Sequence, residues 1–143
     1  MALKWSKKSQ ANIDLAHKDL QNILNAYKTF ATVDISIVET ARSLDTQKKY
    51  LKDGKTKTLN SKHLLTPAEA FDIRVFVKGK PNLSYDTTYL SHVAGVLLGI
   101  AEILYLSGVN THRLCWGGNW DMDGEIITDQ NFQDLCHFEL AVN

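Results

Sequence analysis

Hydrophobic residues recur at three- and four-residue intervals over residues 9–27, which is the spacing of one face of a helix. A second apolar stretch covers residues 86–106 and is followed by Gly108. Glycine commonly ends helices because it adopts left-handed backbone conformations freely. We therefore predict two long helices over these ranges, and Ser9 supplies a hydroxyl that can cap the first one.

Alternating or β-branched segments predict four strands, at residues 33–40, 71–77, 113–116 and 137–142. A short helix is expected over residues 44–52, ended by Asp53 and Gly54, and a long irregular loop over residues 119–133. This order does not require a parallel sheet. We predict a single α+β domain over residues 1–143, in which helices pack on one face of a small antiparallel sheet.

The composition is typical of one soluble globular domain, with 143 residues, 44% hydrophobic and 22% charged. Lys plus Arg and Asp plus Glu both number 16, so no net charge attracts nucleic acid or an anionic surface. We expect a monomer with no nucleic-acid partner. Two cysteines, Cys115 and Cys136, are too few for a disulfide framework and favour a reducing compartment.

The N-terminus has no apolar segment of the kind found in secretory signals. The most apolar stretch, residues 93–106, is interrupted by Glu102 and is shorter than the roughly 20 residues that cross a bilayer. We therefore predict a buried helix there and no membrane insertion.

Charge is uneven along the chain. Lysines crowd the segment before His63, namely Lys48, Lys49, Lys52, Lys55, Lys57 and Lys62. Acidic residues crowd the C-terminal quarter, namely Asp121, Asp123, Glu125, Asp129, Asp134 and Glu139. Either these are solvated loops, or they form two oppositely charged walls of a polar cleft.

Three separated residues suggest a metal site: His63, Asp72 and His137. Two imidazoles and one carboxylate are sufficient protein ligands for a catalytic zinc ion, which keeps a fourth position for water. Asp72 lies within an apolar run, where an unpaired carboxylate is costly, so a metal or a basic partner must satisfy it. Cys136 is a rival ligand, but strand alternation would turn it away from the side shared by His137 and Glu139.

The motifs Ser61-x-His63, Ala70-x-Asp72 and Asp134-x-x-His137-x-Glu139-Leu140 resemble those of the LAS-type zinc peptidases. This family includes D-alanyl-D-alanine carboxypeptidases and phage endolysins that act as L-alanyl-D-glutamate peptidases. The segments around Arg42 and Gln47 and around Trp116 to Asp121 also fit, so the resemblance covers nearly the whole chain. One departure is a His63-to-Asp72 spacing two residues longer than the family pattern, which leaves Glu69 as an alternative ligand.

The resemblance implies that His63, Asp72 and His137 bind Zn²⁺ and that Asp134 is the general base. It implies that Arg42 binds a substrate carboxylate or the developing oxyanion, with a surface salt bridge as the alternative. Gln47, Ser61 and Trp120 are further substrate-binding candidates, although Trp120 is equally well explained as a core residue. Glu139 either orients His137 or is an exposed strand carboxylate.

Asp121, Asp123 and Glu125 alternate in the manner of the opening of a calcium loop, without the full motif, so Ca²⁺ is a secondary expectation. The function expected from the resemblance is a phage endolysin that cleaves the L-Ala–D-Glu bond of peptidoglycan. It would stay in the host cytoplasm until a separate pore releases it to the wall. The alternatives are a D-Ala-D-Ala carboxypeptidase and a zinc-stabilised binding module without activity.

Overall fold

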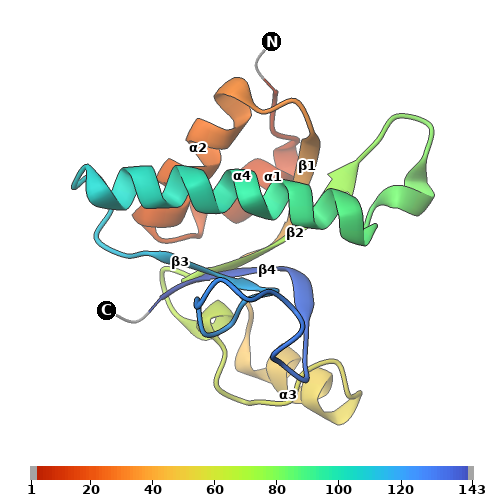
Figure 1. Cartoon of the computed structure of the whole chain (residues 1–143). Coiled ribbons are helices and arrows are strands. Elements are labelled where there is room, and N and C mark those ends of the chain that lie inside the picture. Colours follow the sequence, from red (N-terminus) through yellow and green to blue (C-terminus); the bar gives the residue numbers. More distant parts are fainter. Residues whose placement is uncertain (1–2, 142–143) are drawn as a thin grey trace.

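A computed structural model describes residues 3–141 and confirms the α+β prediction (Figure 1). The helices are α1 (Lys7–Asp14), α2 (Lys18–Phe30), α3 (Leu44–Lys52) and α4 (Thr87–Leu106), with short 3₁₀ turns η1 (Lys62–Leu64) and η2 (Pro81–Leu83). The strands are β1 (Asp34–Glu39), β2 (Ala70–Phe76), β3 (Leu114–Gly117) and β4 (Asp134–Leu140). They form one antiparallel sheet in the order β1-β2-β4-β3.

The two faces of the sheet have different roles. Helices α1, α2 and α4 cover one face, whereas α3 lies on the opposite side (Figure 1). Because successive strand side chains alternate between faces, Phe71 and Phe138 point into the helical core while their neighbours Asp72 and His137 point away from it. The two phenylalanine rings stack with centroids 5.0 Å apart. The sheet therefore separates an apolar core from a polar face.

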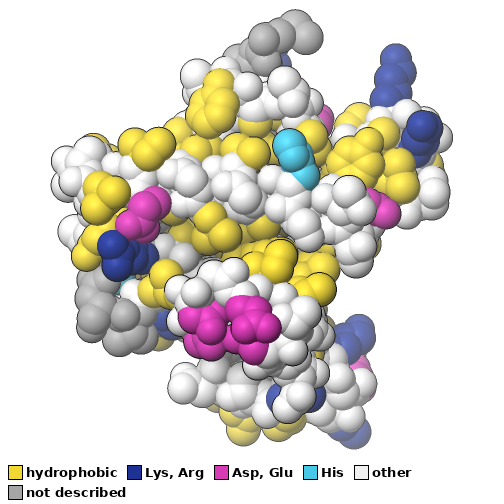
Figure 2. Space-filling view, viewed as in Figure 1, with side chains coloured by type: hydrophobic (Ala, Val, Ile, Leu, Met, Phe, Trp, Pro, Cys, Tyr) yellow, Lys and Arg dark blue, Asp and Glu magenta, His cyan; other side chains and the backbone are white. Residues whose placement is uncertain are grey.

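Helix α4 is the long helix expected near the C-terminal half, and Asp86 caps its start by accepting a hydrogen bond from Tyr89 N at 3.1 Å. It ends before Gly108, whose φ of 80° confirms the predicted glycine stop. One face of α4 is buried in the core, while the side chains of Ile103 and Leu106 are 69% and 70% exposed. Figure 2 shows hydrophobic side chains exposed on this side of the molecule, where α4 runs in Figure 1. By length and composition alone this helix could cross a membrane.

The prediction of one continuous helix over residues 9–27 is wrong, because α1 and α2 are separate helices. Between them, Ala16 pairs with Ala68 in an isolated parallel bridge, and His17 N donates to the carbonyl of Ala68 at 2.8 Å. His17 then caps α2 by accepting a hydrogen bond from Asp19 N through Nδ1. The first helix is capped by Ser6, while Ser9 is buried and accepts a hydrogen bond from Ile37 N.

The last strand also begins earlier than predicted. β4 starts at Asp134, so His137 is its fourth residue rather than its first. The predicted end of this strand at Val142 lies outside the described residues. Asp134 pairs with Gly117 of β3 after a register shift, so it lies at the start of β4, where it lines the same cavity as the metal-ligand candidates.

Asp19 ties α2 to the segment that connects α4 with β3. Its Oδ2 accepts hydrogen bonds from the backbone N–H groups of Thr111 and His112, both at 3.0 Å, and also contacts the His112 ring. Burial alone would raise the pKa of Asp19, but hydrogen bonds from His112 and Thr111 outweigh it and lower this pKa. The ionised carboxylate therefore stabilises the fold.

We predict that Asp19→Asn lowers the free energy of unfolding by about 1–3 kcal/mol at neutral pH, because charge-assisted hydrogen bonds are lost. The folded-state pKa lies below the unfolded one, so the stabilisation is complete above about pH 4 and is lost as the pH falls through the folded-state pKa. Urea unfolding at a series of pH values should show the difference from the wild type shrink in acid. Asp14→Asn, at an exposed position of α1, is the control and should change stability little.

Candidate metal centre

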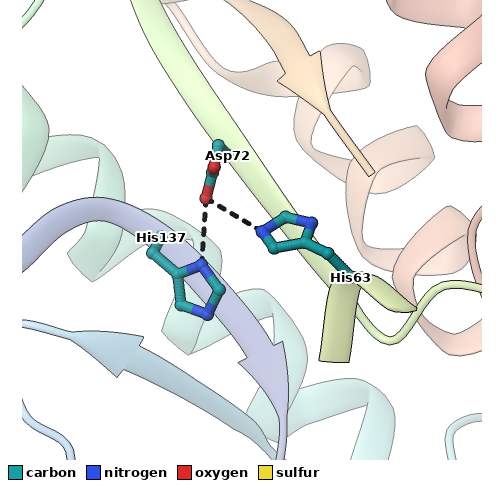
Figure 3. Close-up of side chains that lie close together, drawn as sticks. All are labelled: His63, Asp72 and His137. Atoms are coloured by element: carbon teal, nitrogen blue, oxygen red, sulfur yellow. Dashed lines mark hydrogen bonds and ion pairs between the residues drawn. The ribbon is translucent and has the colours of Figure 1, made fainter. Parts of the chain in front are cut away.

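Asp72 and His137 are direct partners across the β2–β4 pair, and they lie on the sheet face opposite the helical core. His63 approaches them from η1, which precedes β2 in the chain (Figure 3). The three predicted ligands are thus brought together from three separate elements. The structure groups one ligand atom of each within 4.8 Å of the others.

His63 is held by hydrogen bonds on both its backbone and its ring. Ser61 caps η1 by accepting a hydrogen bond from His63 N at 3.2 Å, and Arg42 N donates to the His63 carbonyl at 2.8 Å. The ring Nδ1 lies 2.6 Å from the carbonyl oxygen of Thr40, which can only accept. Nδ1 therefore carries the proton and donates it, and in the neutral ring Nε2 presents a lone pair.

That lone pair has no hydrogen-bond partner, although His63 is only 2% exposed. It points toward Asp72 Oδ1 at 3.5 Å, so two acceptors face each other in a buried site (Figure 3). With a neutral His63 ring, this arrangement is unfavourable unless a proton or a metal ion lies between the two atoms. The observation supports a metal ion as the group that this site is built to bind.

The spacing of the ligand atoms agrees with a small tetrahedral ion. Bonds of about 2.0–2.1 Å to zinc in tetrahedral geometry place ligand atoms roughly 3.4 Å apart. Asp72 Oδ1 lies 3.5 Å from His63 Nε2 and 3.0 Å from His137 Nδ1. Two imidazole nitrogens and one carboxylate oxygen are the donor set of a catalytic site with a free fourth position.

Glu139 orients His137, as one of the two sequence interpretations proposed. Its Oε1 lies 2.9 Å from His137 Nε2, which leaves Nδ1 for Asp72. Burial alone would lower the pKa of His137, but the hydrogen bonds to Asp72 and Glu139 outweigh it and raise this pKa to about 9. Burial acts to raise the pKa of Asp72, yet the hydrogen bond with His137 and the nearby His63 ring outweigh it and hold this pKa well below its usual range.

Neither rival ligand joins the group. Glu69 precedes β2, and its backbone N–H donates to the carbonyl of Lys62. Residues 65–67 form an exposed turn that accommodates the longer spacing, so Asp72 still meets His63. Cys136 instead packs partly against the core, with its Sγ 3.2 Å from Asp134 Oδ1, and burial raises the pKa of its thiol.

The ligand group lies in a cavity of about 600 Å³. Arg42, Ser61, Trp120 and Asp134 line it together with the three ligand candidates. The Trp120 ring lies 5.6 Å from the His137 ring, and its Nε1 donates to the carbonyl of Phe132 at 2.8 Å. Trp120 is therefore a cavity wall rather than a core residue.

Arg42 is already engaged within the protein. Its guanidinium donates to Glu39 through Nε and Nη2 and to Gln47 Oε1 through Nη1 at 2.7 Å. Nη2 also lies 3.8 Å from Asp72 Oδ2, and the side chain is only 9% exposed. Gln47 is fully buried, and its Nε2 donates to the Thr58 carbonyl at 2.7 Å. Gln47 thus holds Arg42 rather than facing the cavity.

The acidic loop gives a second, exposed group of carboxylates at Asp121, Asp123 and Asp129. Glu125 is outside this group and accepts a hydrogen bond from Thr128 Oγ1 at 2.8 Å. The sequence pattern predicts a calcium site from Asp121, Asp123 and Glu125, so the grouped carboxylates differ from it in having Asp129 instead of Glu125. Calcium binding at this loop stays a prediction.

No sequence pattern indicated Glu39, Tyr50 and Phe132, which line the cavity, or Thr40, whose carbonyl contacts His63. Thr40 acts through its backbone carbonyl, which no side-chain pattern can reveal. Tyr50 and Phe132 contact cationic side chains only when the chain is folded. Arg42 Cζ, for example, lies 4.8 Å from the Tyr50 ring centroid.

Two imidazoles and a carboxylate beside a cavity are consistent with a metal-dependent hydrolase. The family model described as phage L-alanyl-D-glutamate peptidase matches residues 1–141, and the chain belongs to this family. It is therefore a peptidoglycan-cleaving peptidase of the endolysin type. The solved structure of Serratia marcescens L-Ala D-Glu endopeptidase ChiX has the same fold, with a TM-score of 0.74 and 23% identity over 98% of this chain and 91% of that one. No curated protein matches the sequence.

We predict that metal affinity rises about tenfold per pH unit up to about pH 9 and then levels off. The reason is that metal must displace the proton which His137 holds below that pH. Competition with a chromophoric chelator across pH 6.5–9.5, corrected for its own protonation, measures this. Glu139→Gln should move the plateau to lower pH, and a flat profile below pH 9 would contradict the role of His137.

We also predict that Gly117→Ala displaces the start of β4. A Cβ on Gly117 would collide with the backbone carbonyl of Asp134, which cannot move independently of the strand. Misplacing a reacting group by about 1 Å can cost roughly 100-fold in rate. Peptidoglycan hydrolysis should fall while metal content is kept. Gly99→Ala, on open surface of α4, is the control and should leave activity unchanged.

Proposed function

We propose that this protein hydrolyses the L-Ala–D-Glu bond of peptidoglycan stem peptides with a zinc ion held by His63, Asp72 and His137. The observation that carries the proposal is the buried, unpaired Nε2 of His63 facing Asp72. A cation between them removes the repulsion, and the nitrogen-rich donor set favours zinc over calcium or magnesium. When bound, the metal would supply Lewis-acid activation of the hydrolytic water and the scissile carbonyl.

Asp134 is the proposed general base. It lines the same cavity as the ligands, and its negative charge contributes to the raised pKa of His137. Its carboxylate would accept a proton from the attacking water and then deliver it to the departing amine of D-Glu. Pairing with Gly117 and the Cys136 thiol positions this carboxylate at the cavity edge.

Arg42 would stabilise the negative charge that develops on the carbonyl oxygen of L-Ala. Glu39 and Gln47 fix the plane of its guanidinium, so little reorganisation is needed during the reaction. Gln47 acts through Arg42, and Ser61 acts through η1, rather than by contacting substrate. Trp120 would pack against the peptide beside His137.

The proposed enzyme works as a single catalytic domain and as a monomer. It would remain in the host cytoplasm until a separate pore releases it to the wall. The second candidate is a D-Ala-D-Ala carboxypeptidase on the same scaffold. Mass spectrometry of digested muropeptides separates the two, because cleavage of L-Ala–D-Glu exposes a new D-Glu amino terminus and carboxypeptidase activity releases free D-Ala.

We predict that Asp134→Asn lowers hydrolysis by about 100-fold or more and leaves metal content unchanged, because only the proton acceptor is lost. His137→Ala should lose both metal and activity. Metal analysis and muropeptide digestion of the same preparations measure the two effects. Asp14→Asn removes the same charge on the far side of the sheet and serves as control. Wall lysis by metal-loaded Asp134→Asn at the wild-type rate would refute the base assignment.

A further inference from the structure

Two cations on the cavity wall have no acidic partner. Arg42 is engaged by Glu39 and Gln47, and Lys62 donates to the Leu140 carbonyl and lies 3.6 Å from Glu139 Oε2. Lys55 and Lys57 also line the cavity, yet within residues 3–141 neither forms an ion pair. They are therefore the cationic side chains of this wall that remain available to a ligand.

Aromatic rings hold both lysines at the cavity. Lys57 Nζ lies 5.1 Å from the centroid of Phe132, which stacks on Trp120 at 6.3 Å, and Trp120 in turn lies beside His137. This series of rings links Lys57 to the metal centre. Cation–π contacts of this length favour one position of a flexible side chain without neutralising its charge.

Lys55 is held in a similar way by Tyr50. Its Nζ lies 5.5 Å from the Tyr50 centroid, and its backbone N–H donates to the Tyr50 carbonyl at 2.8 Å. Arg42 lies on the same ring at 4.8 Å. Both lysines are thus fixed near the reacting groups while their ammonium groups stay exposed.

The same cavity also carries negative charge. Asp134 and Glu139 line it together with Asp72, which is a metal-ligand candidate. A substrate anion placed near the metal would meet repulsion from these carboxylates and attraction from the lysines. The two lysines are therefore the side chains that would attract an anionic group of the substrate.

We propose that Lys55 and Lys57 form a carboxylate-binding subsite that selects peptides with a free carboxylate on the residue that supplies the scissile amine. The inference rests on the proposed function, in which that residue is D-Glu. When D-Glu continues the peptide through its γ-carboxyl, its α-carboxylate is either free or amidated. The subsite distinguishes these two forms, because an ammonium group gains an ion pair with the first form only.

The test compares two synthetic L-alanyl-D-glutamyl peptides extended through the γ-carboxyl, one with a free α-carboxylate and one with an amide. Lys55→Gln combined with Lys57→Gln should raise KM for the free-carboxylate peptide about tenfold, with kcat nearly unchanged. KM for the amidated peptide should not change. Lys55→Arg combined with Lys57→Arg keeps both charges and should retain the wild-type KM.

Lys48→Gln is the matched control, because Lys48 is exposed on α3 and does not line the cavity. It removes a positive charge in the same region and should leave selectivity unchanged. A second measurement needs no variant: the wild-type preference for the free carboxylate should weaken as salt is raised, because partly exposed ion pairs are screened.

The outcomes separate this inference from the proposed function. If the wild type cleaves neither peptide, the proposed function fails. If it cleaves both with equal KM at low salt, or if the double glutamine variant raises KM equally for both, the function stands and the carboxylate subsite is refuted.

Discussion

The antiparallel register between β2 and β4 is the constraint on which the rest of the structure depends. It pairs Phe71 with Phe138 on one face and Asp72 with His137 on the other. A slip of one residue would exchange the faces, exposing the stacked rings and burying the ligands. The packing energy of the core therefore also fixes the two ligands, so the site needs no separate stabilisation of its sheet residues.

Positioning His63 costs more free energy than positioning Asp72 and His137, since His63 comes from a short turn outside the sheet. Its buried Nε2 faces a carboxylate and has no hydrogen-bond partner. The surrounding hydrogen bonds from His63 Nδ1 to Thr40 and from Arg42 N to His63 keep this unfavourable arrangement in place. A bound cation converts the repulsion into coordination, which links metal binding to the stability of the folded chain.

Local patterns predicted much of the fold, because amphipathic periodicity and glycine stops act within a few residues. They located α3 and α4 well, and the α+β class followed from the element order. They missed the break at His17, since it depends on Ala16 pairing with Ala68, far away in the sequence. The candidate metal ligands were recognised from ordered motifs shared with a family, whereas the burial of Gln47 against Arg42 depends on loop packing that no motif contains.

The uneven charge of the sequence had two interpretations, and each applies to part of it. Lys48, Lys49 and Lys52 are exposed on α3 and do not line the cavity, as expected for a solvated surface. Lys55 and Lys57 line the same cavity as Asp134 and Glu139, as expected for a polar cleft. Sequence cannot separate these groups, because the difference arises where the chain leaves α3 and turns back toward η1. Charges of both signs, which balance over the whole protein, thus gather at the candidate site, where a single substrate carboxylate would experience them at short range.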